Sequence, residues 1–265
     1  MALVQDKLFD VSGQTFIVAG AGGGLAKGIV HALNERGARL FLIDNNEERL
    51  KLIGSEIPAA KTMLADITDE KSLSAVVTAV KNSWGQIDGG INAAGVLPIS
   101  HAVALNEDVF KNCLEVNVTG AFFFSRAAVE AMNGRAGRIV HLASVSSFVA
   151  NKGYAAYASS KAGLTQLVRV LAREWAAHGI TVNAIGPALT ETQLTEHYLK
   201  NAEFRRKAIE VIPMGRLGTT ADIVAPILLL LAPGGAFITG RIDRHSHGLD
   251  LVGGAFFCID GELCT

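Results

Sequence analysis

Hydrophobic residues occur along this chain in short, nearly continuous runs that alternate with longer segments of mixed polarity. The runs TFIVA and RLFLI, at Thr15–Ala19 and Arg39–Ile43, are typical of strands buried on both faces of a sheet. Similar runs predict further strands at 62–65, 89–93, 138–142 and 180–184. Between the runs, helical periodicity predicts helices over 25–36, 47–57, 72–84, 107–132, 157–178 and 223–232.

This alternation predicts an α/β fold in which a doubly wound parallel sheet carries helices on both faces, as three layers. The chain contains no repeat, linker or low-complexity tract. One α/β domain can reach about 250 residues. We therefore expect a single domain over residues 1–265. The most apolar run, 223–232, is about half a membrane span in length, so we interpret it as a buried helix.

The composition narrows the classes of function. Apolar residues make up 49% and charged residues 18%, which favours a large core. The net charge is −1, and the absence of a basic stripe argues against binding to nucleic acid or a membrane surface. A polar start without a signal peptide and three cysteines without a CxxC pair favour a cytoplasmic location. We expect no metal at His245 and His247, and we interpret His141, inside a strand, as a core histidine.

A glycine-rich segment, AGAGGGLA at 19–26, follows the first predicted strand and opens the first predicted helix. Glycines permit close approach of the backbone to a phosphate, and the free N–H groups at a helix N-terminus favour a pyrophosphate. Asp44 follows the second strand, where a dinucleotide site needs an acid for the ribose hydroxyls. Its charge would repel a 2′-phosphate and Gly23 offers no cation, so we predict NAD rather than NADP. The alternative interpretation of Asp44 is a helix cap.

The spacing Gly20-x-x-x-Gly24-x-Ala26 resembles the Gly-x-x-x-Gly-x-Gly pattern of the short-chain dehydrogenase/reductase family. Later motifs resemble that family in the same order, namely ADIT at 65–68, NAAG at 92–95, NVTGAF at 117–122, Tyr157-x-x-x-Lys161 and NAIGPALTET at 183–192. The resemblance implies a Rossmann-like fold that assembles as a homo-oligomer, a tetramer or a dimer. It also implies these cofactor-binding residues: Gly20, Gly24, Leu25, Asp44, Asp66, Ile67, Asn92, Ala94, Gly95, Tyr157, Lys161, Pro187, Thr190 and Thr192.

The segment YAAYASSKAG at 154–163 contains two candidate proton donors. Tyr157 and Tyr154 precede Lys161 by four and seven residues, and both spacings return to one face of a helix. Only Tyr157 is close enough for the ammonium to act on its phenol, so we expect Lys161, together with the nicotinamide cation, to lower the pKa of Tyr157. Tyr157 is then the predicted catalyst, and Tyr154 is expected at the helix start, on the rim of the pocket.

The family resemblance implies a catalytic set of four residues: Asn117, Ser144, Tyr157 and Lys161. By the same resemblance, Ser144 binds the reacting oxygen and Asn117 holds a water that links Lys161 to solvent. Ser146 and Ser147 are rival hydroxyls that we place in a loop, where they would line the substrate pocket. The expected substrate contacts are Ser144, Ser146, Tyr154 and Tyr157.

These observations predict an oxidoreductase that transfers hydride between NAD(H) and a secondary alcohol or ketone of small size. The segment expected to bind substrate, 189–211, is mixed in polarity, which favours a polyol, a sugar or a sugar acid. The alternatives are a 3-oxoacyl-type ketone reductase, which the chain resembles nearly as well, and a non-catalytic redox sensor that binds NAD. Residues 241–265 depart from the family pattern, so we expect an atypical C-terminal tail.

Overall fold

Seven parallel strands form the central sheet of the protein, for which the computed structural model describes residues 6–210, 212–245, 256–257 and 263–264. The strands are β1 Thr15–Ala19, β2 Arg39–Asp44, β3 Lys61–Leu64, β4 Gly89–Asn92, β5 Gly137–Leu142, β6 Ile180–Pro187 and β7 Ile242–His245. Their spatial order is β3-β2-β1-β4-β5-β6-β7, and every neighbouring pair is parallel. The six predicted strands all form, with bounds that differ by at most a few residues.

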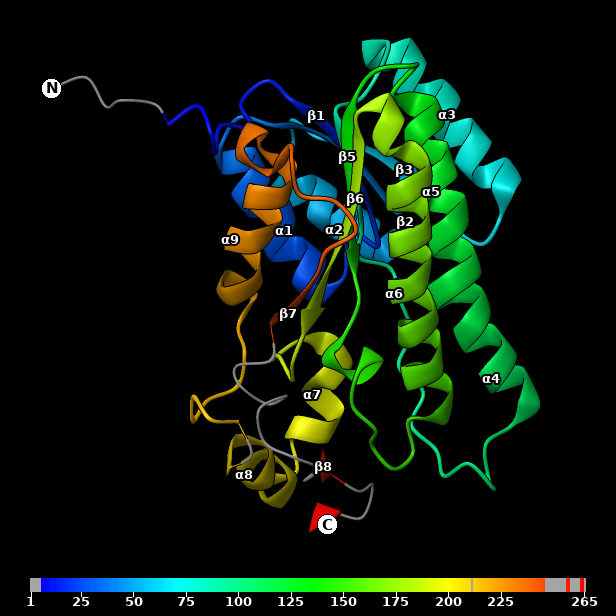
Figure 1. Ribbon diagram of the computed structural model, residues 1–265, viewed down its shortest axis with the longest axis vertical. Helices are drawn as coiled ribbons and strands as arrows, with labels where there is room; N and C mark the ends of the chain where they lie inside the picture. The colour runs from blue at the N-terminus through cyan, green and yellow to red at the C-terminus, as the bar shows by residue number, and fades with distance from the viewer. Residues whose placement is uncertain (1–5, 211, 246–255, 258–262, 265) are drawn as a thin grey trace, which may run out of the picture.

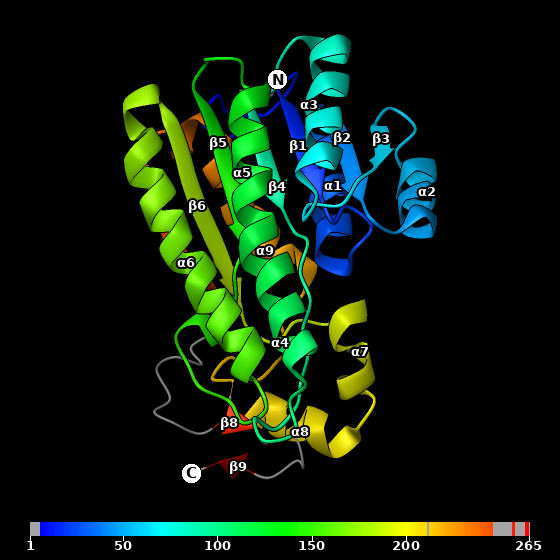
Figure 2. The ribbon, with the colours of Figure 1, turned by 90° about the vertical axis from the view of Figure 1, so that its right-hand side faces the viewer.

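Helices cover both faces of this sheet. The helices are α1 Gly24–Glu35, α2 Glu47–Glu56, α3 Glu70–Trp84, α4 Glu107–Leu114, α5 Gly120–Ala131, α6 Ala155–Trp175, α7 Gln193–Leu199, α8 Ala202–Glu210 and α9 Thr220–Leu231. Figure 1 shows α1 and α9 on one side of the sheet and α3, α5 and α6 on the other, and Figure 2 looks onto the second layer. The predicted three-layered, doubly wound α/β fold is therefore confirmed.

The core consists of two large apolar layers, one on each face of the sheet. Ile17 of β1 packs on the α3–α5–α6 side, while its neighbours Phe16 and Val18 pack on the α1–α9 side. This explains why the strand sequences are apolar at consecutive positions. Burial of each such side chain contributes roughly 1.5–3 kcal/mol, so the strand ends are held firmly.

The carboxyl ends of the strands lie at one end of the sheet, at the bottom in Figure 1. β1 and β4 are neighbours there, but the helices that follow them, α1 and α4, cover opposite faces of the sheet. In open α/β sheets, ligands bind outside the carboxyl ends of the strands at such a point. The glycine-rich segment, the 92–95 turn and Ser144 all follow strands that end there.

The long helix predicted over 107–132 is interrupted. A π-helical segment, Glu115–Thr119, separates α4 from α5 and contains Asn117. A π-helical turn accommodates an extra residue and is frequent at functional sites. Its cause here is tertiary, because the Asn117 side chain bonds to the main chain of Val96, 21 residues away. The prediction of one continuous helix from periodicity alone was therefore wrong.

The segment expected to bind substrate, 189–211, contains the two short helices α7 and α8. Thr192 and Thr195 form a capping box that starts α7. Leu199, Ala208 and other apolar residues of this segment pack on Val145 in a third, smaller cluster. Both helices lie below the carboxyl ends of the strands in Figures 1 and 2.

The end of the chain extends the fold in two ways. β7 pairs with β6, with Ile242 beside Ala184, and so adds a strand inside the segment expected to be atypical. β8, Phe256–Phe257, pairs antiparallel with β9, Leu263–Cys264. His247 and Cys258 lie outside the described residues. Within the described part of the chain, no helix combines the length and apolarity that a membrane crossing requires.

Candidate active site

The glycine-rich segment forms a tight turn between β1 and α1. Gly20 has a φ of +68°, and a Cβ placed there would lie 2.7 Å from both the nitrogen and the Cα of Ala94. A side chain at Gly20 is therefore excluded by conformation and by space. Gly23 precedes α1, whose first N–H groups point out of the helix at the carboxyl end of the sheet. This arrangement can bind a phosphate through the main chain.

Asp44 is the acid beside this turn, at the end of β2. Its side chain is buried, and its carboxylate accepts hydrogen bonds from the main-chain nitrogens of Gly22 at 3.0 Å and Asn46 at 2.9 Å. The cap of α2 is Asn46, which accepts from the nitrogen of Arg49, so the interpretation of Asp44 as the cap is wrong. A carboxylate has about four acceptor positions, so Asp44 retains capacity for hydroxyl groups.

Arg49 lies near the glycine-rich turn and Asp44, which together we call the cofactor cradle. The sequence motifs did not reveal this residue. A Cβ on Gly22 would lie only 2.5 Å from the Cβ of Arg49, so the first turn of α2 lies against the glycine segment. The Arg49 side chain is exposed. Gly23 supplies no cation, as expected, but the first turn of α2 carries the guanidinium of Arg49 next to the glycine segment. The one signal in the sequence was that Arg49 follows Asp44 by only five residues, in the first turn of the predicted helix.

The other predicted cofactor residues of the first half lie at the same end of the sheet. Asp66 accepts hydrogen bonds from the main-chain nitrogen and hydroxyl of Thr68, at 2.8 and 2.7 Å. Ile67 is buried, and a Cβ on Gly120 would lie 2.8 Å from its Cδ1, so α5 approaches this turn closely. Asp66 and Ile67 thus have local structural roles beside any contact with a ligand.

Lys161 lies at the centre of the second half of the site. It is buried in α6, and its Nζ donates to the carbonyl of Leu142 at 2.8 Å. Burial lowers the pKa of Lys161 to about 8. Its Nζ is 5.8 Å from the ring centroid of Tyr157. A Cβ on Gly95 would lie 3.4 Å from the same Nζ, so the 92–95 turn and β5 both enclose the ammonium.

The pKa of Tyr157 moves in the direction opposite to the prediction. Burial raises it, and a hydrogen bond with Ser144 opposes that rise. The Lys161 ammonium does not lower it, because this group bonds to Leu142 and faces the ring rather than the phenol oxygen. The part of the expected lowering that was assigned to Lys161 is therefore wrong, and the part assigned to the nicotinamide cation stays a prediction.

Tyr154 occupies the position expected for it, since it is the residue that precedes α6. Its ring packs edge-on against that of Tyr157, with centroids 5.8 Å apart. Burial, followed by the proximity of Tyr157 and Tyr198, raises the pKa of Tyr154 to about 12. Tyr154 is thus a rigid wall beside Tyr157 and is far from ionisation at neutral pH.

The three candidate serines differ in what they contact. Ser144 follows β5, bonds with Tyr157 and accepts from the main-chain nitrogen of Ser146 at 3.1 Å. Ser146 is buried in the short 3₁₀ turn Val145–Ser147. The Ser147 hydroxyl donates to the carbonyl of Lys161 at 2.9 Å, so it secures α6. Ser144 is the hydroxyl that meets the candidate catalyst.

Asn117 connects three parts of the site. Its Nδ2 donates to the carbonyl of Val96 at 3.0 Å and to the Ser160 hydroxyl at 2.9 Å, while its Oδ1 accepts from the Val96 nitrogen at 2.9 Å. Ser160 in turn donates to the carbonyl of Tyr157 at 2.7 Å. The amide nitrogen has no hydrogen left for the expected water, which would have to meet the amide oxygen or the main chain.

Ser160 and Cys113 were missed by sequence reasoning, although Ser160 lies inside the Tyr-Lys motif. Both are buried, and their side chains lie 3.5 Å apart. Burial is the main cause that raises the pKa of the Cys113 thiol, which keeps it protonated and unreactive. The three-residue spacing of Ser160 from Tyr157 was the one available signal.

The end of β6 brings the last predicted cofactor residues to the same region. Pro187 ends the strand, and the buried Thr190 donates its hydroxyl to the carbonyl of Ala188 at 3.0 Å. Thr192 starts α7 through its capping box with Thr195. The hydroxyls of both threonines therefore shape the turn into α7.

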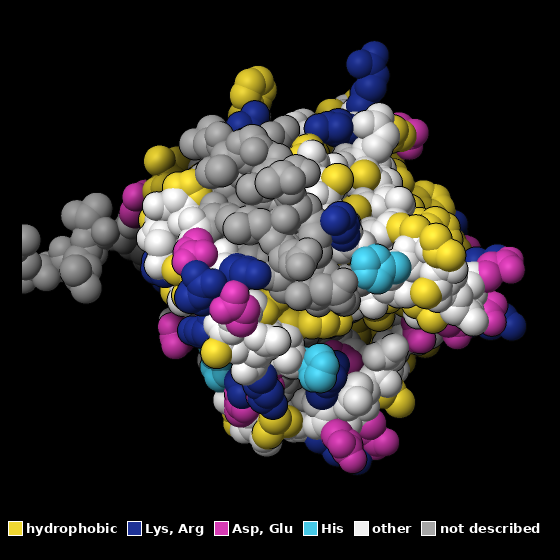
Figure 3. Space-filling view, turned by 90° about the horizontal axis from the view of Figure 1, so that it is seen from below, with side chains coloured by type: hydrophobic (Ala, Val, Ile, Leu, Met, Phe, Trp, Pro, Cys, Tyr) yellow, Lys and Arg dark blue, Asp and Glu magenta, His cyan; other side chains and the backbone are white. Residues whose placement is uncertain are grey.

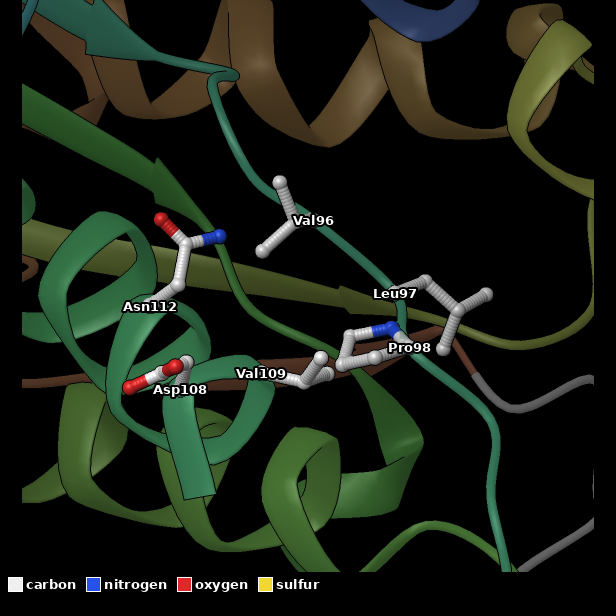
Figure 4. Close-up of a pocket in the computed structure, with 6 residues that line it drawn as sticks. All are labelled: Val96, Leu97, Pro98, Asp108, Val109 and Asn112. Carbon is white, nitrogen blue, oxygen red and sulfur yellow. The ribbon is translucent and has the colours of Figure 1, made fainter. Parts of the chain in front are cut away.

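A pocket of about 360 Å³ lies beside this site, between the segment after the 92–95 turn and α4. Figure 4 shows its lining side chains, which are Val96, Leu97, Pro98, Asp108, Val109 and Asn112. It is mostly apolar, with one carboxylate and one amide. Figure 3 looks at this end of the molecule and shows charged side chains of both signs rather than a single basic surface. Within the described residues, no group of three or more His, Cys, Asp or Glu side chains could hold a metal ion.

Comparisons with known proteins identify the family. The model of the family described as "Enoyl-(Acyl carrier protein) reductase" (adh_short_C2) matches residues 20–250. The chain belongs to the short-chain dehydrogenase/reductase family. It is therefore an oxidoreductase of the kind that uses a nicotinamide cofactor.

Two similar relatives differ in the substrate that they are named for. A galactitol 2-dehydrogenase (L-tagatose-forming) from Cereibacter sphaeroides is 34% identical over 240 residues, which cover 89% of this chain and 94% of the relative. A 3-oxoacyl-[acyl-carrier-protein] reductase from Vibrio cholerae is 31% identical over 245 residues, which cover 92% and 100%. A solved short-chain type dehydrogenase/reductase from Mycobacterium ulcerans matches with a TM-score of 0.89 and 25% identity, over 92% of each chain.

Proposed function

We propose that this protein transfers hydride between NAD(H) and a polar secondary alcohol or its ketone, with Tyr157 as the acid–base catalyst. The observation that carries the proposal is the position of Tyr157 at the carboxyl end of the sheet, where it bonds with Ser144 and the Lys161 ammonium lies over its ring. Bound nicotinamide would accept or supply the hydride. Cofactor binding falls to the residues implied by the family motifs, from Gly20 to Thr192.

Proton transfer is carried out by the protein's own side chains. Tyr157 donates the proton to the developing alkoxide in reduction and accepts it from the alcohol in oxidation. Ser144 donates a hydrogen bond to the same oxygen and fixes its position. Lys161 places its cation beside Gly95 and the ring of Tyr157. By the family resemblance, it would hold the hydroxyls of the nicotinamide ribose. Ser146 and Tyr154 complete the substrate wall.

The preference for NAD rests on Asp44. Its buried carboxylate, already bonded to Gly22, faces the place of the adenosine ribose in this fold. A 2′-phosphate there would meet an unpaired like charge at a cost of several kcal/mol, or roughly 10² or more in kcat/KM. Arg49 acts in the opposite direction, because it is the cation closest to the glycine segment on α2.

The test compares kcat/KM for NAD and NADP with one substrate in three proteins. We expect the wild type to prefer NAD, Asp44→Ala to narrow the preference, and Arg49→Ala to widen it. Equal values for both cofactors in the wild type, or a preference for NADP, would refute the assignment of Asp44.

The substrate class is proposed from the mixed polarity of α7 and α8 and from the likeness to the galactitol dehydrogenase. The likeness to a 3-oxoacyl reductase supports a ketone reductase as the second candidate. A panel of polyols, sugar acids and 3-oxoacyl thioesters, followed by nicotinamide absorbance, distinguishes the two. Turnover of none of them, together with tight NAD binding, would instead support a redox sensor.

We also propose that the chain forms one domain and assembles as a homo-oligomer, a tetramer or a dimer, in the cytoplasm. The family resemblance supports assembly, and the three dispersed cysteines suit a reducing compartment. Light scattering after gel filtration tests the assembly. A mass of one chain at micromolar concentration would contradict it.

A further inference from the structure

His141 is a buried histidine that the proposed chemistry does not use. It lies in the middle of β5 and is fully buried. Each ring nitrogen has a polar neighbour. Nε2 is 2.9 Å from the hydroxyl of Ser125 on α5, and Nδ1 is 3.4 Å from the side-chain nitrogen of Asn92, at the end of β4. A buried imidazole with two such partners is part of a network rather than a filler of the core.

The direction of every bond in this network follows from one main-chain group. The nitrogen of Ala94 donates to the side-chain oxygen of Asn92 at 3.1 Å, which fixes the orientation of that amide. The Asn92 nitrogen must then donate to Nδ1 of His141, and the single ring proton must be on Nε2. Nε2 donates to Ser125, whose own hydrogen goes to the carbonyl of Ala121 at 2.7 Å.

The surroundings keep His141 in the neutral form that this network requires. Burial, together with the charge of Lys161, lowers the pKa of His141 to about 3. The ring of Phe124 packs edge-on against it, with centroids 6.3 Å apart. A protonated ring would turn Nδ1 into a donor that faces the amide nitrogen of Asn92. The neutral ring accepts that bond and satisfies both groups.

The network ends at the wall between the cofactor cradle and the catalytic cluster. Ala94 is the residue that leaves no room for a side chain on Gly20, since a Cβ added to Gly20 would lie 2.7 Å from the Ala94 main chain. The next residue, Gly95, lies against the Nζ of Lys161. Asn92 bonds directly to Ala94, so loss of its support would displace the main chain on the cradle side of this wall first. His141 is linked to this main chain through Asn92, which bonds to both His141 and Ala94.

We propose that His141 is a positioning residue for the nicotinamide cofactor, which holds Asn92 and, through it, the main chain of Ala94 and Gly95. The inference rests on the proposed function, because it concerns the same cofactor site. It adds a residue outside the family motifs to that site. Loss of the His141–Asn92 bond should weaken NAD(H) binding and raise KM for NAD, with kcat near the wild-type value.

Two substitutions each keep one half of the network. In His141→Asn, the amide oxygen falls near the place of Nδ1 and can accept from Asn92, while the bond to Ser125 is lost. In His141→Gln, the amide nitrogen reaches toward Ser125, while the bond from Asn92 is lost. We expect NADH titrated by fluorescence to bind His141→Asn within about threefold of the wild type. His141→Gln should bind roughly tenfold more weakly, which is about 1.4 kcal/mol and within the range that one hydrogen bond contributes.

His141→Leu removes both bonds without adding a polar group, and it serves if His141→Gln does not fold. It should also bind NADH roughly tenfold more weakly. Thermal unfolding of each variant separates positioning from packing. NADH affinity that follows thermal stability rather than the Asn92 bond, or wild-type affinity in His141→Leu, would overturn the inference. If the wild type binds neither NADH nor NADPH, the proposed function fails, and this inference fails with it.

Discussion

The cofactor cradle and the catalytic cluster lie at the same end of the sheet, but they are built from different parts of the chain. The cradle consists of main chain, with Gly20 against Ala94 and the Asp44 carboxylate bonded to two main-chain nitrogens. The cluster consists of buried side chains, in which Lys161 and Asn117 bond to main-chain groups of other elements.

This difference determines what each region can tolerate. Gly20 has no side chain, so a substitution there cannot remove a functional group. It can only add volume against Ala94 or change the backbone φ, and cofactor binding should be sensitive to both. The cluster is sensitive to the loss of one proton or one donor, even where the volume is kept. Substitutions that separate these two sensitivities test the assignment of both regions.

The largest effect is expected at Tyr157. Tyr157→Phe keeps the ring and its packing on Tyr154 but removes the proton, so kcat should fall by about 10² to 10⁴. Tyr154→Phe is the matched control, since it removes a hydroxyl whose pKa is about 12 from the adjacent ring. It should change KM modestly and leave most of kcat. If Tyr154→Phe were inactive and Tyr157→Phe active, Tyr154 would be the acid–base catalyst and the assignment made here would be wrong.

The next effect is expected at Ser144. Ser144→Ala removes the donor for the reacting oxygen and should lower kcat by roughly 10², as the loss of one oxyanion donor does. Ser147→Ala is the control, because its hydroxyl bonds to the carbonyl of Lys161 instead. It should reduce thermal stability more than turnover. A mild Ser144→Ala with a severe loss of kcat in Ser146→Ala would show that the wrong serine was chosen.

A smaller effect, on binding rather than chemistry, is expected at Gly20. Gly20→Ala meets a positive φ and the Ala94 main chain, so NADH affinity should fall by at least about tenfold. Gly13→Ala has the same positive φ, +72°, with nothing within 4 Å of the added carbon. It should lose about 1–2 kcal/mol of stability and bind NADH normally. Equal NADH affinities in the two variants would show that Gly20 is not part of the cofactor site.

The last effect concerns stability and pH rather than turnover or cofactor binding. The pKa of His141 is lowered from 6.5 to about 3 on folding, so the unfolded chain binds the proton more tightly in that range. Stability should therefore fall as pH drops from about 6.5 toward 3, by about 1.4 kcal/mol per pH unit from this residue. Urea unfolding of the wild type and His141→Asn at several pH values measures the difference. Parallel curves for the two proteins would contradict a neutral, buried His141.

The sequence predicted the parts that local patterns determine. β1 was predicted with its observed bounds, and the glycine turn, Asp44 and the Tyr157–Lys161 pair lie at one end of the sheet as expected. The π-helical segment around Asn117 could not be predicted, because it depends on a bond to Val96.

The partners of His141 were hidden for the same reason. His141 was correctly interpreted as buried, but Ser125 and Asn92 come from other elements, 16 and 49 residues away along the chain. The direction of the pKa shift of Tyr157 was wrong because helical spacing places Lys161 near the ring without showing that Leu142 binds its ammonium. Patterns give the residues of a site, whereas the direction of their hydrogen bonds requires the fold.

The central claim is that the main-chain cradle supplies most of the cofactor affinity while the Tyr157 hydroxyl moves the proton, and one titration tests it directly. NADH is titrated into Tyr157→Phe by fluorescence, and turnover is measured on the same preparation. The account predicts a dissociation constant within about twofold of the wild type, with kcat lowered by at least about 10². A dissociation constant that weakens in proportion to kcat would contradict it, because Tyr157 would then serve to bind the cofactor rather than to move the proton.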